Sequence, residues 1–271
     1  MRLFAAVISL LIPSDPGGNY DLVGRLVARH LPKHLPGQPV IVPQNMPGAG
    51  GLIVANHLYN VAPRDGSVVG LVQGSVVQDQ ALGTPNVRFD AARFSWIGTP
   101  TRRGGVTVLW HTAKPPILFG ASNVRHVAYG KFAGYEVIKG YRTAVDIVLA
   151  MGRREIDAMN VFAWSEWAIH RPEWVRDRLI VPAPAPPPSP PLDFLMAGDA
   201  LGRPLAAPPG APIDELTTAY RKMVADPTFL ADALKLGLDV EPVIGEGLSS
   251  LVREVLATPR PTIDAVNAVI K

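Results

Sequence analysis

Short apolar runs alternate with turns rich in glycine and proline in the first third of the chain. Val7–Ile12 is apolar and half β-branched, which is typical of a buried parallel strand. Pro13–Gly18 interrupts any regular element, because it contains prolines and adjacent glycines. Asp21, which follows, can cap or open a helix. The apolar positions of that helix have helical spacing and are Leu22, Val23, Leu26, Val27 and Leu31. We therefore predict a strand, a glycine turn and a helix.

The same pattern occurs a second time. Val40–Val42 is predicted as a strand, Pro43–Gly51 as a glycine turn and Leu52–Val61 as a helix. At such a turn the free backbone N–H groups and the positive end of the helix dipole point at one place. Each turn is therefore a candidate anion site, although a single one could equally be a plain strand-to-helix corner.

A third strand, Ser67–Val72, ends at Gln73, Gly74 and Ser75. We place this end at the same edge of the sheet, where parallel sheets bind their ligands. Strands and helices keep alternating in the middle of the chain, which predicts a parallel α/β lobe beginning near His111. The strands expected there and just before it are Trp96–Gly98, Val106–Trp110, Ile117–Phe119, Tyr135–Tyr141 and Ile156–Val161, with a turn at Gly120–Asn123 and a helix after Thr143.

The last third of the chain contains a proline-rich segment followed by predicted helices. Pro182–Pro191 holds seven prolines in ten positions, so we expect an extended surface segment, with a recognition motif for a partner as the alternative. Ile213–Val224 is predicted as a helix. Asp226 and Pro227 cap and open another, which Gly237 ends.

Composition narrows the class of protein. The 271 residues are 48% hydrophobic and 18% charged, which is typical of a globular protein. The net charge of +3 favours anionic ligands, but Lys and Arg are scattered, so we do not expect nucleic-acid binding. The chain contains no cysteine, which excludes disulfides and thiolate metal sites. Its first twelve residues are similar to a signal peptide but lack a small-residue cleavage site before Pro13, and we expect the signal peptide to be absent or truncated.

Other chemistries are poorly supported. A dinucleotide fingerprint at Gly48–Gly51 would need a glycine where Ile53 stands. His30 and His34 have metal-ligand spacing, but Pro32 lies between them and no third ligand is near, so we expect a solvated surface face and no metal. No catalytic motif is present, and we expect neither catalytic residues nor a cofactor. Asp21 and Arg25 have the spacing of an i,i+4 pair that would rigidify the first turn.

Several segments resemble a known family. PGGNYDLVGR (Pro16–Arg25), GQPVIVPQNMPGAGG (Gly37–Gly51) and APRDGSVVGLV (Ala62–Val72) are similar to the Bug family, the extracytoplasmic solute receptors of tripartite tricarboxylate transporters. Four further segments also resemble that family: PNVRF, FSWIGTP, APPGAP and DPTFLADALKLGLD. The likeness covers both ends of the chain well and the middle poorly.

The resemblance implies a two-lobed α/β fold like a type II periplasmic binding protein. Lobe one would comprise residues 1–109 and 204–271, and lobe two residues 110–203. The function implied is that of a periplasmic, monomeric receptor that captures a small organic carboxylate and delivers it to membrane transporter subunits.

In this interpretation the lobe-one turns would hold one carboxylate through backbone N–H groups and bridging water, and a hinge motion would close lobe two over the other end. The expected lobe-one ligand contacts are Ser14, Gly17, Gly18, Asn19, Tyr20, Asp21, Gly48, Ala49, Gly50, Gly51, Gln73, Gly74 and Ser75. Those of lobe two are Ser122, Asn123, Thr143 and Asn160. Ser14, Ser75 and Ser122 could donate hydroxyl groups to the acid or only cap the helices that follow.

The chain departs from the family pattern in lobe two, where the segments at Lys114–Pro115, at Ser122–His126 and before Leu205 are shorter. Two alternatives therefore stay open. The cleft could serve an enzyme that processes small acids, or a soluble sensor that presents its closed form to a signalling partner.

Overall fold

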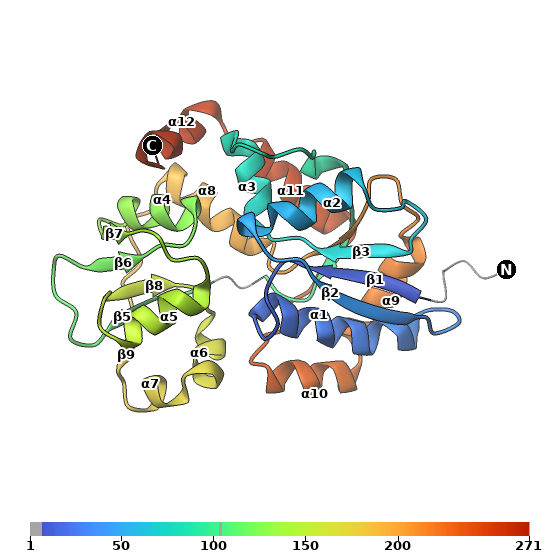
Figure 1. The fold of residues 1–271 in the computed structure, drawn as a ribbon, viewed down its shortest axis with the longest axis horizontal. Coiled ribbons are helices and arrows are strands. Elements are labelled where there is room, and N and C mark those ends of the chain that lie inside the picture. The colour runs from blue at the N-terminus through green and yellow to red at the C-terminus, as the bar shows by residue number, and fades with distance from the viewer. Residues whose placement is uncertain (1–6, 103–104, 271) are drawn as a thin grey trace. The chain divides into compact units, whose positions relative to one another are not determined.

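The computed structural model describes residues 7–102 and 105–270, which form two compact units. Unit 1 contains residues 7–102 and 198–257, and unit 2 contains residues 105–197 and 258–270. Each unit has its own sheet (Figure 1).

The sheet of unit 1 is mixed. Its strands, in spatial order, are β11 (Val243–Ile244), β4 (Ser95–Thr99), β10 (Leu205–Ala207), β3 (Val68–Leu71), β1 (Val7–Ile12) and β2 (Val40–Asn45). β1 is parallel to both β2 and β3, as predicted, whereas β10 runs antiparallel to β3 and β4. Because β1 lies between β2 and β3 and helices pack against it, Ile8, Leu10 and Ile12 are fully buried.

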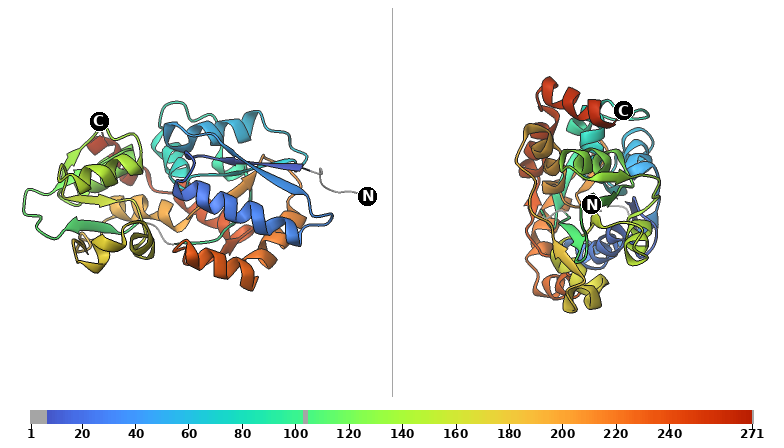
Figure 2. Two further views of the ribbon diagram at one scale, coloured as in Figure 1. Left: turned by 60° about the horizontal axis from the view of Figure 1, so that its bottom comes forward. Right: turned by 90° about the vertical axis from the view of Figure 1, so that its left-hand side faces the viewer.

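Helices cover both faces of this sheet, as Figures 1 and 2 show. One face carries α1 (Asn19–His30), the 3-10 helix η1 (Leu31–His34), α9 (Asp214–Val224) and α10 (Pro227–Lys235). The other carries η2 (Ala49–Gly51), α2 (Leu52–Asn60), α3 (Ser75–Leu82), η3 (Ala91–Arg93) and α11 (Glu246–Leu256). The predicted cap of α10 is confirmed, since the Asp226 carboxylate accepts a hydrogen bond from Thr228 N at 2.7 Å.

The sheet of unit 2 has the order β7 (Glu136–Ile138), β6 (Leu118–Gly120), β8 (Ala158–Asn160), β5 (Thr107–Trp110) and β9 (Ile180–Pro182). Its helices are α4 (Val124–Phe132), α5 (Ala144–Gly152), α6 (Trp164–His170), α7 (Pro172–Arg176) and α12 (Arg260–Ile270). The prediction of a parallel sheet in this part of the chain is only partly correct. β7, β6 and β8 are parallel, but β5 pairs antiparallel with both β8 and β9.

Several boundaries differ from the expected ones. β5 lies in unit 2 because its backbone pairs with β8 and β9, although the expected border was residue 109. α12 packs on α4 in unit 2, whereas we expected the chain to its end in lobe one. Residues 183–189 of the proline-rich segment form no regular element, but Pro190 and Pro191 open α8 (Pro190–Ala200), since proline is tolerated in a first helical turn.

Candidate ligand-binding site

Three loops of unit 1 meet at one edge of its sheet. β2, β1 and β3 are parallel neighbours, so the loops after Asn45, Ile12 and Leu71 leave the same edge. These loops and the helix starts after them bring together the predicted residues of lobe one: Ser14, Gly17, Gly18, Asn19, Tyr20, Asp21, Gly48, Ala49, Gly50, Gly51, Gln73, Gly74 and Ser75.

Side chains hold the three loops to one another. Asn45 Nδ2 donates to Ser14 O at 2.8 Å and to Asp21 Oδ1 at 2.9 Å, which ties the second loop to the first. Gln73 Nε2 donates to Pro13 O at 3.4 Å, which ties the third loop to the first. Asn45 was not predicted as a site residue, although it lies in the segment Pro43–Gly51 that we predicted as the second glycine turn; it is the last residue of β2.

Asp21 braces the first loop. Its side chain is 3% exposed and accepts from Gly17 N at 2.9 Å and from Arg25 Nε at 2.9 Å, so the predicted pair with Arg25 is confirmed. Burial favours the neutral carboxyl, but hydrogen bonds from Arg25, Gly17 and Asn45 outweigh it and lower the pKa of Asp21. The start of α1 therefore already holds an anion of the protein itself.

The second loop has an unusual backbone. Gly48, Ala49, Gly50 and Gly51 all have positive φ, at 127°, 47°, 61° and 92°. Positive φ favours glycine, and three of these four residues are glycine. Gly51 N donates to Gly48 O at 3.0 Å, so the turn closes on itself just before the next helix. α2 starts directly after it with no side-chain cap and no acidic residue in its first turn. Residues 47–50 are exposed.

The third loop leads into α3, which also lacks a side-chain cap and an acidic first-turn residue. Gly74 is buried, and a Cβ there would collide with the carbonyl oxygen of Gly198. Gln73 and Ser75 are half-buried beside it.

In the first loop, Ser14 Oγ is buried without a hydrogen-bond partner in the described part of the chain. The edge thus combines two helix starts free of acidic residues with an unpaired hydroxyl.

The predicted residues of unit 2 also share an edge. β6, β7 and β8 are parallel, so Ser122, Thr143 and Asn160 lie at or after the carboxyl ends of their strands. Asn123 Oδ1 caps α4 by accepting from His126 N at 2.9 Å, and Thr143 Oγ1 caps α5 by accepting from Asp146 N at 3.2 Å. These two oxygens thus have structural roles.

Two of the helix starts at this edge are occupied by carboxylates. Asp146 accepts from Arg142 N and Thr143 N at 3.1 and 3.0 Å, and the buried Glu166 accepts from Ala163 N at 2.9 Å. The start of α4 has no acidic residue. There His126, which sequence reasoning missed, is buried with Nδ1 at 3.3 Å from Ser122 Oγ. Burial, with the charge of Arg125, lowers the pKa of His126 to about 3.

Asn160 belongs to a buried hydrogen-bond chain. Its Nδ2 donates to Thr107 Oγ1 at 3.1 Å, and Thr107 Oγ1 donates to Tyr129 OH at 2.7 Å. Asn160 Oδ1 is buried and has no partner among the described residues. Thr107 and Tyr129 were not predicted, because they come from β5 and α4 and meet Asn160 only in the folded sheet.

Comparison with known proteins places the fold. No family model matches the chain. Protein BugT of Bordetella pertussis is 49% identical over 49 residues, a match that spans 18% of this chain and 14% of BugT. The periplasmic binding protein BugD superimposes with a TM-score of 0.68 at 18% identity, covering 97% of this chain and 98% of that one.

Two Rhodopseudomonas palustris proteins are similarly close. Rpa4515, solved with adipate, has a TM-score of 0.70 at 16% identity and covers 96% of each chain. MatC, solved with bound malate, has a TM-score of 0.69 at 18% identity, covering 96% of this chain and 98% of its own. The chain has the fold of the Bug-type periplasmic binding proteins. The predicted resemblance and the predicted two-lobed α/β class are thus confirmed.

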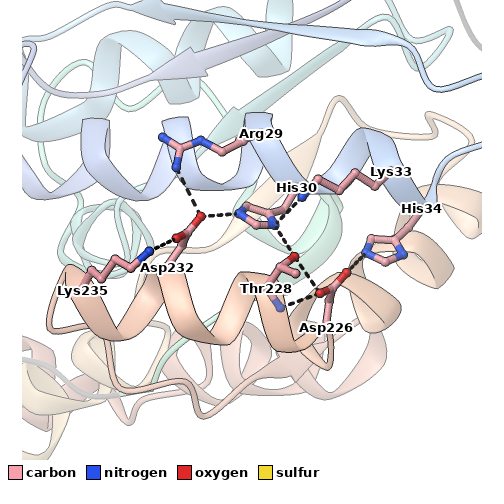
Figure 3. Close-up of polar contacts among 8 residues, drawn as sticks. All are labelled: Arg29, His30, Lys33, His34, Asp226, Thr228, Asp232 and Lys235. Carbon is pink, nitrogen blue, oxygen red and sulfur yellow. Dashed lines mark hydrogen bonds and ion pairs between the residues drawn. The ribbon is translucent and has the colours of Figure 1, made fainter.

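One prediction about residues outside this candidate site is wrong. His30 does not lie on a solvated face but is 1% exposed where α1 packs on α10 (Figure 3). Its Nε2 is 3.1 Å from Asp232 Oδ2, its Nδ1 is 3.2 Å from Lys33 Nζ, and its ring meets Phe229 edge-on. His34 faces Asp226 instead. Both carboxylates lie about two hundred residues away in the sequence, so local spacing could not reveal them.

Neither a metal-binding cluster nor a membrane-spanning helix is found among the described residues. Within residues 7–102 and 105–270, no cluster of three or more His, Cys, Asp or Glu side chains could hold a metal ion. No helix in the same part of the chain is both long enough and apolar enough to span a membrane.

Proposed function

We propose that the chain is a solute-binding receptor that captures a small organic carboxylate in the periplasm. It would deliver the acid to a membrane transporter of the tripartite tricarboxylate type. The main support for this proposal is that three loops, joined to one another by side-chain hydrogen bonds, meet at one edge of the unit 1 sheet.

The electrostatics of that edge favour an anion. The starts of α2 and α3 carry no acidic residue, whereas the start of α1 is neutralised by Asp21. We therefore assign the ligand carboxylate to the loops Gly48–Gly51 and Gln73–Ser75. Each helix start favours an anion by about 0.3–1 kcal/mol when exposed and up to about 2 kcal/mol when partly buried. The Ser14 hydroxyl, which has no partner among the described residues, would donate a further hydrogen bond to the acid.

Proteins of the same fold support the choice of ligand. MatC holds malate and Rpa4515 holds adipate, and both are small organic acids. The likeness to BugD, a periplasmic binding protein, also supports the periplasmic location.

Binding without catalysis is the interpretation that the titratable groups favour. A general base works best with a pKa near the operating pH. The pKa of His126 is about 3, and the pKa of Asp21 is lowered while its oxygens accept from three protein donors. Neither group is suited to proton transfer near pH 7, so no observation favours the alternative of an acid-processing enzyme.

A thermal-shift screen of small carboxylates tests the proposal. At least one acid should raise the melting temperature of the protein. Gly50→Leu should abolish this shift, because a side chain there would fill the open space beside the turn. Gly37→Leu is the matched control, since Gly37 also has positive φ and open space but precedes β2, at the opposite edge. The proposal is wrong if the Gly50 variant responds as the control does.

A further inference from the structure

The sheet of unit 1 has an open edge at β2. In the described part of the chain β2 is the last strand on that side, and it pairs with β1 alone (Figure 1). Val40 is 60% exposed and Val42 is 38% exposed, on the same face of the strand. An exposed apolar edge strand has unpaired backbone groups that can bind a strand of another chain. Such an edge needs a feature that prevents pairing.

The position of Pro43 within β2 provides that feature. Along a strand, successive residues direct their backbone groups alternately toward one neighbour and toward the other side. Met46 N donates to Ile12 O at 2.8 Å, so the even-numbered residues of β2 face β1. Ile41, Pro43 and Asn45 therefore direct their backbone groups outward. Pro43 lies at the centre of this outer row and has no N–H group to donate.

The sheet of unit 2 has the same arrangement at β9. This strand is the last on its side among the described residues, and it pairs antiparallel with β5. His111 N donates to Leu179 O at 2.9 Å. Ala183 N donates to Thr107 O at 2.8 Å, so every second residue from Leu179 to Ala183 faces β5. Pro182 therefore faces outward, where it again offers no donor.

The two remaining edges have other features that hinder pairing. β11 has two residues, which leaves few backbone groups to pair. β7 begins with Glu136, whose charged side chain is exposed. Each of the four described sheet edges thus has one of the features by which natural sheets avoid edge-to-edge pairing, and at β2 and β9 that feature is a proline.

We propose that Pro43 and Pro182 prevent each unit from adding a strand of a second copy of this chain at its open edge. Two β2 strands related by a two-fold axis would run antiparallel, with Ile41 opposite Asn45 of the other copy and the two Pro43 residues opposite each other. The prolines remove the central hydrogen bonds of that ladder and leave two carbonyl oxygens without donors. Their role therefore concerns association, and it does not depend on a ligand.

Sedimentation velocity across a series of protein concentrations tests this inference. Pro43→Val supplies the missing N–H group and a residue that favours strands. The average mass of this variant should rise with concentration toward that of a dimer, whereas the parent protein stays monomeric. Pro182→Val should associate in the same way through unit 2. Pro36→Val and Pro187→Val are matched controls, because both prolines are exposed but lie outside the strands.

A second measurement identifies the surface that associates. In Pro43→Val the backbone N–H groups of Ile41 and Asn45 should exchange more slowly with solvent deuterium when the protein is concentrated. Adding Val40→Lys should restore the monomer, because a charged side chain on an edge strand opposes pairing. Thermal melts check that every variant is folded.

Any of four results would overturn the inference. The first is that folded Pro43→Val and Pro182→Val both stay monomeric. The second is that the control variants associate as strongly. The third is that association occurs only in variants that have lost their melting transition. The fourth is that the parent protein already forms a dimer in which Ile41 N–H is protected.

Discussion

Gly51 lies directly against Gln73 in unit 1. A Cβ on Gly51 would be 3.0 Å from Gln73 Cγ, a tight contact that would push the Gln73 side chain aside, and Gly51 also has a φ of 92°. Gln73 in turn donates to Pro13 O. This contact connects the second loop to the third and, through Gln73, to the first, so the three loops form one packed edge.

Gly51→Ala should therefore destabilise the protein for two reasons, crowding against the Gln73 side chain and backbone strain. The left-handed conformation alone costs about 1–2 kcal/mol for a residue with a side chain. Gly83→Ala is the matched control, because Gly83 has a φ of 69° and an added Cβ there would meet nothing within 4 Å. Urea denaturation should give a larger loss for Gly51→Ala. An equal loss in both variants would show that the contact with Gln73 does not matter.

The ion pairs between α1 and α10 predict a specific pH dependence. Hydrogen bonds from Lys235 and His30 lower the pKa of Asp232 to about 2 (Figure 3). Because the folded-state pKa is below the unfolded value of about 3.9, the stabilisation is complete above pH 4 and is lost as the pH falls toward 2. Asp232→Asn should melt at a lower temperature than the parent protein at pH 7, and the gap should shrink between pH 4 and 2. A gap that is constant with pH would contradict the assignment.

His126 predicts a pH dependence in a different range. Burial and the charge of Arg125 lower its pKa to about 3, below the unfolded value of about 6.5. The unfolded chain therefore binds more protons between these values, and the protein loses stability as the pH falls from 6.5 toward 3. From pH 6 to pH 4 the loss from this one group is roughly 2 kcal/mol, since one bound proton corresponds to about 1.4 kcal/mol per pH unit.

His126→Phe should flatten this slope while costing some stability at pH 7, where the contact with Ser122 Oγ is lost. Urea denaturation at several pH values measures both effects. Parallel stability profiles for the variant and the parent protein would mean that His126 is not the group responsible.

The order of residues along the chain was sufficient to predict the parts of the fold that depend only on neighbouring residues. Val7–Ile12 is short, apolar and followed by glycines, so its strand and the turn after it could be predicted, as could the pair between Asp21 and Arg25 one helical turn apart. The direction of β5 and the place of α12 could not, because both depend on which distant segment pairs with them.

The same limit applies to the candidate site. The glycine turns could be found from the sequence because glycine is required where φ is positive. The partners of Asn160 and His30 could not, since Thr107 precedes Asn160 by 53 residues and Asp232 follows His30 by 202. Polar groups that meet only in the folded structure leave no pattern in the local sequence.

The central claim is that the unit 1 edge binds a carboxylate, and calorimetry on an acid and its amide tests it most directly. The acid is the tightest binder from the thermal-shift screen, and the amide replaces the carboxylate assigned to the loops Gly48–Gly51 and Gln73–Ser75. Two helix starts can favour the anion by a few kcal/mol, and an amide N–H facing backbone N–H groups costs about 1–3 kcal/mol more. The account predicts that the acid binds at least tenfold more tightly, which requires only about 1.4 kcal/mol. Equal affinity of the acid and the amide would contradict it.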